Sequence, residues 1–337
     1  MRRRVRAGVC VGVIASTMFL AGCSSQSSPT SCHPHGSPAR LVAGCGTLFG
    51  IATQPHSFAR LKIVERTLGL RFDLVYRFHD IDDRLPTADE RALVADDRVL
   101  HISIDARRYQ DPGHRVAWSA VASGAYDAAL SKQARGVASL RAPVFLTFDH
   151  EPDQPQRRLL GSPSDFVAAW RHVHDLFVRA GATNAVWVWV VTGYGPTRAI
   201  AARMWPGNSY VDWISWEAYN ASGCREGHTD PAQFQSFDET ALPFYWWIRK
   251  HGPPLGIDVS KPMMISEAGS VVYSGDPGLT AKWYQQIPGV LAQHPQIRAI
   301  ALWDRHGIAG CGYDFDHSAL INQAVSTAGS QPPITAG

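Results

Sequence analysis

Two glutamates follow short apolar runs at widely separated points of the sequence. The run from Val144 to Phe148 leads into His150 and Glu151, and the run from Met263 to Ser266 leads into Glu267. Buried parallel strands of an α/β barrel present catalytic side chains at their C-terminal ends. Two carboxylates facing one cleft could cleave a glycosidic bond, one as the acid and the other as nucleophile or base. The competing interpretation is that one of these glutamates only caps a helix or turn.

Other catalytic patterns are incomplete in this sequence. Gln154 stands where an H-E-x-x-H motif would need its second histidine, and no G-x-S-x-G is present, which disfavours a zinc protease and an α/β-hydrolase. Arg77, His79 and Asp80 end an expected strand, where they could line a cleft or merely pair with one another. The two-carboxylate chemistry requires neither a metal ion nor an organic cofactor.

Strand-like and helix-like segments alternate along the chain and would position these residues. The expected strands are 47–52, 72–78, 99–104, 144–148, 185–191, 210–216, 262–266 and 297–303. The expected helices are 57–70, 88–95, 126–140, 164–180, 197–204, 237–249, 279–291 and 318–328. Eight alternations predict a single (β/α)8 TIM barrel. A doubly wound open sheet is the alternative, but Phe49-Gly50-Ile51-Ala52 lacks the G-x-G-x-x-G of its first turn.

The N-terminal region is typical of a lipoprotein signal peptide over residues 1–22. Four arginines precede an apolar stretch from Ala7 to Leu20, and Leu20-Ala21-Gly22-Cys23 resembles a bacterial lipobox. Cleavage before Cys23 would leave lipid on its thiol and anchor an exported protein on the outer face of the membrane; an ordinary secretory signal is the alternative. Residues 23–45 predict a Ser/Pro-rich tether. The catalytic domain is expected at 46–328 and a disordered tail at 329–337.

The net charge of the chain limits the kinds of partner that we expect. The chain has 32 Lys+Arg and 29 Asp+Glu, and removing the four signal arginines leaves 28 against 29, a formal charge of −1. A near-neutral protein gives no electrostatic case for binding nucleic acid. The 11 tryptophans weakly favour sugar binding, because indole rings stack on sugar faces. We therefore expect a monomer whose partners are a glycan and the membrane.

Four cysteines remain once Cys10 leaves with the signal and Cys23 takes lipid. Outside the cytoplasm they predict two disulfides, for which three pairings are possible. We favour Cys32–Cys45 and Cys224–Cys311. A zinc site is disfavoured because the sequence contains no Cys-x-x-Cys.

An ordered series of motifs resembles glycoside hydrolase family 26, the retaining (β/α)8 glycosidases that include β-mannanases. The series is His150-Glu151, Asp165–Phe177, Asn184–Trp189, Trp205–Gly207, Tyr210–Trp213, Glu217–Asn220, Ile265–Gly269 and Trp303, and it spans 46–328. The resemblance implies that Glu151 is the general acid/base and Glu267 the nucleophile. It also implies that His150 contacts the substrate, that Tyr219 hydrogen-bonds the nucleophile and that Trp303 forms a sugar platform.

The expected site includes two further residues, and two segments of the sequence differ from the family pattern. Trp216 and Arg77 are added as candidate substrate contacts. Two segments on the leaving-group side differ from the usual family sequence: Pro152-Asp153-Gln154-Pro155 and Val191-Thr-Gly-Tyr194. The sequence therefore does not decide which glycan is the substrate. We expect a retaining, endo-acting β-glycosidase for β-mannan or a related β-glycan. The alternatives are a non-catalytic carbohydrate-binding lipoprotein and a hydrolase that remodels the cell's own envelope glycans.

Overall fold

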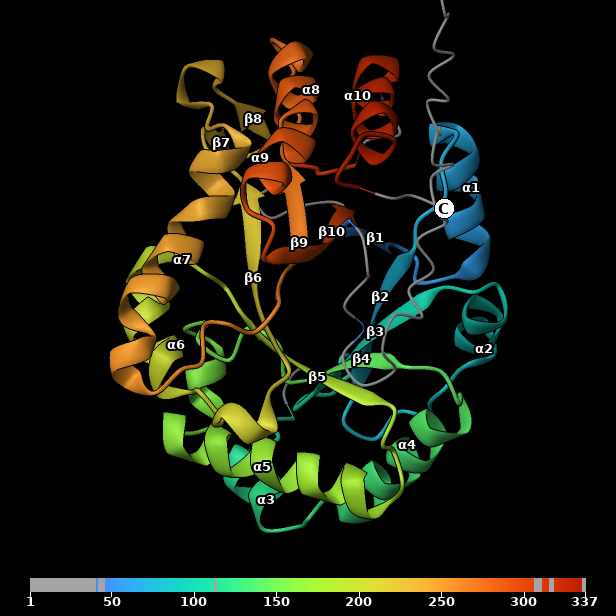
Figure 1. Cartoon of the computed structure of the whole chain (residues 1–337), viewed down its shortest axis with the longest axis vertical. Coiled ribbons are helices and arrows are strands. Elements are labelled where there is room, and N and C mark those ends of the chain that lie inside the picture. Colours follow the sequence, from blue (N-terminus) through green and yellow to red (C-terminus); the bar gives the residue numbers. More distant parts are fainter. Residues whose placement is uncertain (1–40, 42–45, 112–113, 306–310, 315–317, 335–337) are drawn as a thin grey trace, which may run out of the picture. The chain divides into compact units, whose positions relative to one another are not determined.

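Eight parallel strands close into a barrel at the centre of the fold (Figure 1). The computed structural model describes residues 41, 46–111, 114–305, 311–314 and 318–334. The barrel order is β1-β10-β9-β6-β5-β4-β3-β2. The strands are β1 Leu48–Thr53, β2 Leu74–Asp80, β3 Val99–Asp105, β4 Val144–Phe148, β5 Ala185–Val191, β6 Trp213–Asn220, β9 Met263–Ser270 and β10 Ile297–Asp304. The predicted TIM barrel is confirmed.

Helices surround the barrel and alternate with its strands. They are α1 Phe58–Leu68, α2 Ala88–Ala95, α3 Trp118–Ala122, α4 Asp127–Ser139, α5 Pro163–Arg179, α6 Arg198–Arg203, α7 Phe237–His251, α8 Pro277–Gln285, α9 Ile287–Gln293 and α10 Ala319–Gly329. Helix α5 begins with a capping box, in which Ser162 and Asp165 satisfy each other's backbone N–H groups. Helix α3 was not expected, and the single helix expected at 279–291 is divided into α8 and α9.

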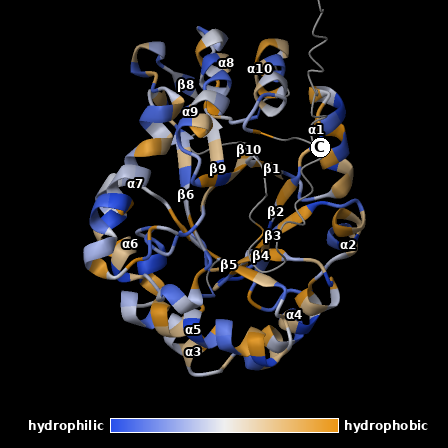
Figure 2. Ribbon diagram, in the orientation of Figure 1, coloured by the Kyte–Doolittle hydropathy of each residue, from blue (hydrophilic) through white to orange (hydrophobic). Residues whose placement is uncertain are grey.

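Alternation along the strands creates two apolar clusters. One cluster fills the barrel interior with residues such as Leu74, Phe145 and Trp213, and the other packs the outer strand faces against the helices. Successive side chains of a strand point to opposite faces, so neighbouring residues belong to different clusters. Figure 2 shows hydrophobic residues along the central strands and on the helices around them. The face that a side chain occupies therefore follows from its parity in the strand.

Two strands run further than expected, and this changes where the site residues lie. Strand β6 continues to Asn220 and β9 continues to Ser270, so Glu217 and Glu267 lie within strands instead of after them. The two glutamates are register partners, and a register irregularity immediately precedes Glu217. Such irregularities re-aim side chains at the rims of barrels.

Segments outside the barrel strands are partly different from expectation. Ile334, in the predicted disordered tail, is buried and forms a parallel bridge with Thr47, whose N–H donates to Pro333 O at 2.8 Å. Leu41, in the predicted tether, packs into the barrel-interior cluster. The predicted signal peptide, the lipidated Cys23 and the Cys32–Cys45 pair lie outside the described residues.

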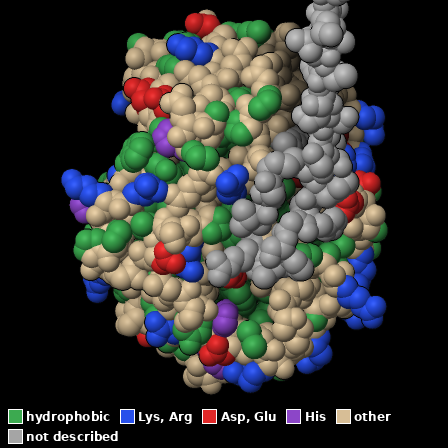
Figure 3. Space-filling view, viewed as in Figure 1, with side chains coloured by type: hydrophobic (Ala, Val, Ile, Leu, Met, Phe, Trp, Pro, Cys, Tyr) green, Lys and Arg blue, Asp and Glu red, His purple; other side chains and the backbone are tan. Residues whose placement is uncertain are grey.

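Charged side chains of both signs are interspersed over the face drawn in Figure 3. This mixture agrees with the nearly balanced charge of the sequence after residue 22. Among the helices within the described residues, none combines the length and apolar character that crossing a membrane requires.

Candidate active site

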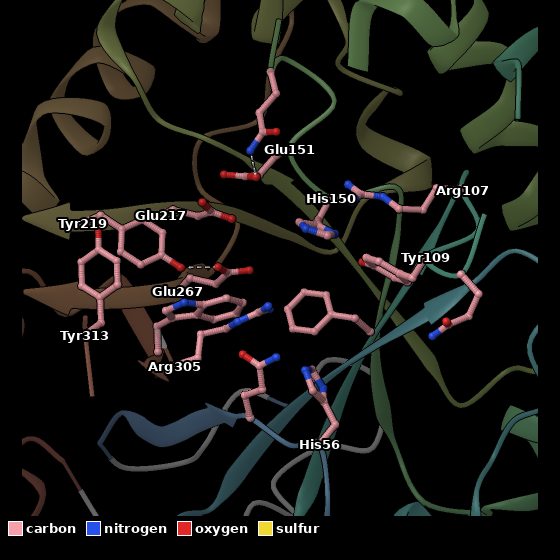
Figure 4. Close-up of a pocket in the computed structure, with 15 residues that line it drawn as sticks. His56, Arg107, Tyr109, His150, Glu151, Glu217, Tyr219, Glu267, Arg305 and Tyr313 are labelled. Atoms are coloured by element: carbon pink, nitrogen blue, oxygen red, sulfur yellow. Dashed lines mark hydrogen bonds between the residues drawn. The ribbon is translucent and has the colours of Figure 1, made fainter. Parts of the chain in front are cut away.

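A pocket of about 840 Å³ lies at the C-terminal ends of the barrel strands (Figure 4). Its lining comes from segments at or just after β1, β2, β3, β4, β6, β9 and β10. The lining residues are Gln54, His56, Phe78, Arg107, Tyr109, Gln110, His150, Glu151, Gln154, Glu217, Tyr219, Glu267, Trp303, Arg305 and Tyr313. This is the end of the barrel where TIM-barrel enzymes carry their active sites.

Glu267 is a buried carboxylate held by a tyrosine of the neighbouring strand. The phenolic O–H of Tyr219 donates to Oε2 of Glu267, whereas the buried Oε1 has no hydrogen-bond partner among the described residues. Burial and the charge of Glu151 raise the pKa of Glu267 to about 8 against the opposing effects of His150, Tyr219 and Arg305. One oxygen of Glu267 is thus fixed, and the other remains available to a ligand.

Glu151 reaches the pocket from a turn with unusual backbone geometry. Asp149 and Glu151 both have φ of 51°, in the left-handed region that costs a non-glycine residue about 1 kcal/mol or more. Asp149 offsets this cost by accepting three hydrogen bonds: from Ala106 N at 3.0 Å, Trp118 Nε1 at 2.7 Å and Arg157 Nη1 at 2.7 Å. These buried contacts hold the turn in place and direct Glu151 toward the pocket.

His150 is oriented by a buried carboxylate. Its Nδ1 lies 2.8 Å from Oδ1 of Asp105, which also accepts a hydrogen bond from Ser103. Although burial opposes protonation, the charge of Asp105 raises the pKa of His150. Because Nδ1 is occupied by Asp105, Nε2 is the nitrogen through which His150 can bind a ligand.

Glu217 is a third carboxylate of the pocket, and the expected sites did not include it. Burial and then the charges of Glu151 and Glu267 raise its pKa well above the ordinary value, as does its hydrogen bond with Glu151. Strand parity could have found it, because Glu217 and the predicted Tyr219 are two residues apart in β6 and share a face. The pocket therefore holds three carboxyl groups, those of Glu151, Glu217 and Glu267.

The alternation of side chains along the strands also places two expected substrate contacts, Arg77 and Trp216, outside the pocket. Arg77 precedes the pocket residue Phe78 in β2, and its buried side chain lies on the opposite face, outside the pocket lining. Trp216 precedes Glu217 in β6, is fully buried and donates through Nε1 to Ala241 O of α7 at 2.8 Å. Neither side chain lines the pocket.

The predicted Trp303 does line the pocket, at the end of β10. The guanidinium of Arg305 lies 5.0 Å from the centre of its ring. Phe78 meets the indole edge to face, with ring centroids 5.7 Å apart. These contacts give the pocket an apolar wall between β2 and β10.

The expected Cys224–Cys311 disulfide is present, with a Cα–Cα distance of 6.3 Å. It joins the short β7–β8 hairpin (Cys224–Arg225 and His228–Thr229) to the segment that carries Tyr313. Tyr313 packs beside Tyr219, with ring centroids 5.0 Å apart. The disulfide therefore supports one wall of the pocket.

Comparisons of the sequence with known proteins find distant relatives that match part of the chain. No family model matches the chain. A β-1,3-xylanase of a Vibrio species is 30% identical over 159 residues, which are 47% of this chain and 31% of the relative. Endoglucanase H of Acetivibrio thermocellus is 24% identical over 246 residues, 69% of this chain and 25% of that protein. The chain thus spans less than a third of the length of these curated relatives.

Solved structures resemble the barrel over most of its length. A family 26 β-mannanase from Bacteroides ovatus superimposes with a TM-score of 0.61 at 14% identity, covering 86% of this chain and 90% of that one. The resemblance to glycoside hydrolase family 26 that the sequence indicates is therefore confirmed in the fold.

Proposed function

We propose that this protein is a retaining, endo-acting glycoside hydrolase that cleaves a β-linked polysaccharide, β-mannan or a related β-glycan. The observation that carries the proposal is that Glu151 and Glu267 enter one pocket from different strands, with Tyr219 bonded to Glu267. The names of the similar proteins, a β-mannanase, a β-1,3-xylanase and an endoglucanase, all describe enzymes acting on glycans.

The pocket supports a double displacement. Oε1 of Glu267 attacks the anomeric carbon while Glu151 protonates the departing oxygen, which breaks the glycosidic bond and forms a glycosyl-enzyme. Glu151 then takes a proton from water, whose oxygen releases the sugar from Glu267. Tyr219, His150 and Arg305 favour the ionised form of Glu267 that this attack requires.

In this mechanism Glu217 keeps a proton beside Glu151, which is the acid of the first step. Its raised pKa keeps a proton on Glu217, which is hydrogen-bonded to Glu151. The proton is then available to the leaving oxygen through Glu151. Trp303, Phe78 and Tyr313 offer aromatic surfaces for the apolar faces of the sugar rings.

Azide rescue of the two glutamate variants tests these roles. We expect Glu267→Ala and Glu151→Ala to lose activity on aryl β-glycosides by about a thousandfold or more. Azide filling the space of Glu267 should give an α-glycosyl azide, whereas azide attacking the glycosyl-enzyme of Glu151→Ala should give a β-glycosyl azide. Glu226→Ala, an exposed glutamate in the β7–β8 turn, serves as the control. Folded variants that hydrolyse as fast as the parent, or a parent enzyme whose own hydrolysis product has inverted configuration, would contradict the proposal.

We also propose that the protein is exported and held at the membrane by lipid on Cys23. The Cys224–Cys311 disulfide supports an oxidising compartment. Labelling of the parent with an azido fatty acid, lost in Cys23→Ser together with membrane fractionation, is the expected result. Equal labelling of both forms would contradict lipidation at this thiol.

A further inference from the structure

Two arginines enter the pocket that the carboxylates occupy. Arg107 follows β3 and Arg305 follows β10, and both lie among the lining residues (Figure 4). A neutral glycan is bound through hydroxyl hydrogen bonds and aromatic faces, and neither contact needs a permanent cation. Two guanidinium groups in one sugar pocket therefore need an explanation of their own.

The guanidinium of Arg305 lies over an aromatic ring without pairing with a carboxylate in the described part of the chain. Its guanidinium lies 5.0 Å from the ring centre of Trp303, and it forms no ion pair with a carboxylate of the described residues. A stacked guanidinium keeps its N–H groups directed outward in its own plane, which suits a planar anionic acceptor. The ring thus holds Arg305 in place, and its side-chain N–H groups have no acceptor among the residues that the structure describes.

Arg107 is placed in the same manner on the other side of the pocket. Its guanidinium lies 4.9 Å from the ring centre of Tyr109, and its Nε lies 3.6 Å from Oδ2 of Asp105. Asp105 already accepts hydrogen bonds from Ser103 and Tyr109 and pairs with His150, so its negative charge is divided among several partners. Asp105 therefore balances only part of the positive charge of Arg107, which remains able to attract an anionic ligand.

The neighbouring Arg108 provides a comparison, because its guanidinium is bound to a carboxylate of the chain itself. Both Nε and Nη2 of Arg108 donate to Oδ2 of Asp82, at 2.9 and 2.6 Å, and it does not line the pocket. With the residues that the structure describes, Arg107 and Arg305 form no such pair of hydrogen bonds. They are therefore candidates for ligand binding where Arg108 is not.

We propose that the glycan bound here is acidic, and that Arg107 and Arg305 bind carboxylate or sulfate groups on its sugars. This inference rests on the proposed function, because it names the substrate class of the same pocket. The two arginines stand at β3 and β10, which β1 and β2 separate in the barrel order. They would accordingly contact different sugar residues, which favours a chain with more than one acidic sugar.

The test compares neutral and acidic forms of one backbone. Oligosaccharides of β-1,4-mannan and mixed-linkage β-glucan are used neutral, with C6 oxidised to carboxylate, and sulfated, so that the carboxylate and sulfate sources are distinguished. Hydrolysis and calorimetric binding are measured for the parent, Arg107→Gln, Arg305→Gln, the double variant and the matched control Arg108→Gln. Binding is measured in the Glu151→Gln background, where cleavage does not interfere.

We expect the parent to prefer an acidic form by about tenfold or more in kcat/KM, the range of one charge-assisted hydrogen bond. The preference should fall in each single variant, vanish in the double variant and persist in Arg108→Gln. It should also weaken as salt rises, whereas rates on neutral chains should not.

Three results overturn the inference while leaving the proposed function intact. The first is hydrolysis without an acidic preference, and the second is a preference that survives in the double variant. The third is an Arg305→Gln variant whose rates on neutral and acidic chains change by the same factor, because Arg305 would then only favour the ionised form of Glu267. If the parent hydrolyses none of these chains, the proposed function fails on this panel and binding decides: acidic selectivity lost in the double variant supports the inference, and equal or absent binding refutes it.

Discussion

Tyr219 donates its phenolic O–H to Oε2 of Glu267 across the β6–β9 pair, although its register partner in β9 is Gly269. Glu267 is the register partner of Glu217, so two side chains of β6 act on one carboxylate of β9. Tyr219 favours the ionised form of Glu267, and Glu217, when ionised, repels it. Two residues of β6 therefore influence the protonation of Glu267, in addition to its burial and the charges of His150 and Glu151.

Removing the phenol should make Glu267 harder to ionise. In Tyr219→Phe the pKa of Glu267 rises above its value of about 8, because a hydrogen bond that lowers it is lost. We expect the ascending limb of kcat/KM against pH to move to higher pH. At neutral pH kcat/KM should fall by roughly ten- to a hundredfold, as for the loss of a hydrogen bond to a charged group.

Tyr194→Phe is the matched control, since Tyr194 is 65% exposed and outside the pocket lining. Its profile should superimpose on that of the parent. An ascending limb that stays in place in Tyr219→Phe would show that Glu267 does not control it.

Glu217→Gln tests the influence of Glu217 on the acid step. Burial raises the pKa of Glu217, and repulsion from the charges of Glu151 and Glu267 raises it further. The amide removes that repulsion, so the descending limb of kcat/KM should move to lower pH by about one unit or more. Steady-state rates from acid to alkaline pH measure the shift, with Glu226→Gln as control. An unmoved descending limb would assign the ionisation to another group.

Strand parity explains which site residues could be predicted from the sequence. The strands were found because their apolar runs are short and bounded, and the carboxylates at 151 and 267 follow such runs. Arg77 and Trp216 were misplaced because nearness to a strand end was considered without the face. Once Tyr219 is placed in the pocket, parity puts Glu217 inside and Trp216 outside.

Other features depend on contacts distant in sequence. The left-handed backbone of Glu151 relies on Asp149, which is held by Ala106, Trp118 and Arg157. Those residues lie in α3 and in segments after β3 and β4, and no local pattern joins them. The stacking of Arg305 and Arg107 on aromatic rings is likewise set by the folded turns.

The two tryptophans that sequence reasoning placed together should behave differently. Trp303→Ala removes a pocket wall, so KM should rise by roughly ten- to a hundredfold while the midpoint of thermal unfolding changes little. Trp216→Ala empties a fully buried site against α7, so the free energy of unfolding should fall by about 3–5 kcal/mol. Denaturant unfolding and steady-state kinetics on both variants separate the two effects. A large KM change in a stable Trp216→Ala would contradict its place outside the pocket.

Reduction of the Cys224–Cys311 disulfide should loosen one pocket wall without opening the barrel. The bridge joins residues 87 apart in sequence, and losing it should lower the free energy of unfolding by about 2–4 kcal/mol. Because Cys311 lies close to Tyr313, which packs beside Tyr219, KM should rise more than kcat falls. Kinetics with and without a thiol reductant measure this, and Cys224→Ser/Cys311→Ser should match the reduced parent and ignore the reductant. Equal KM values for the oxidised and reduced parent would show that Tyr313 holds its place without the bridge.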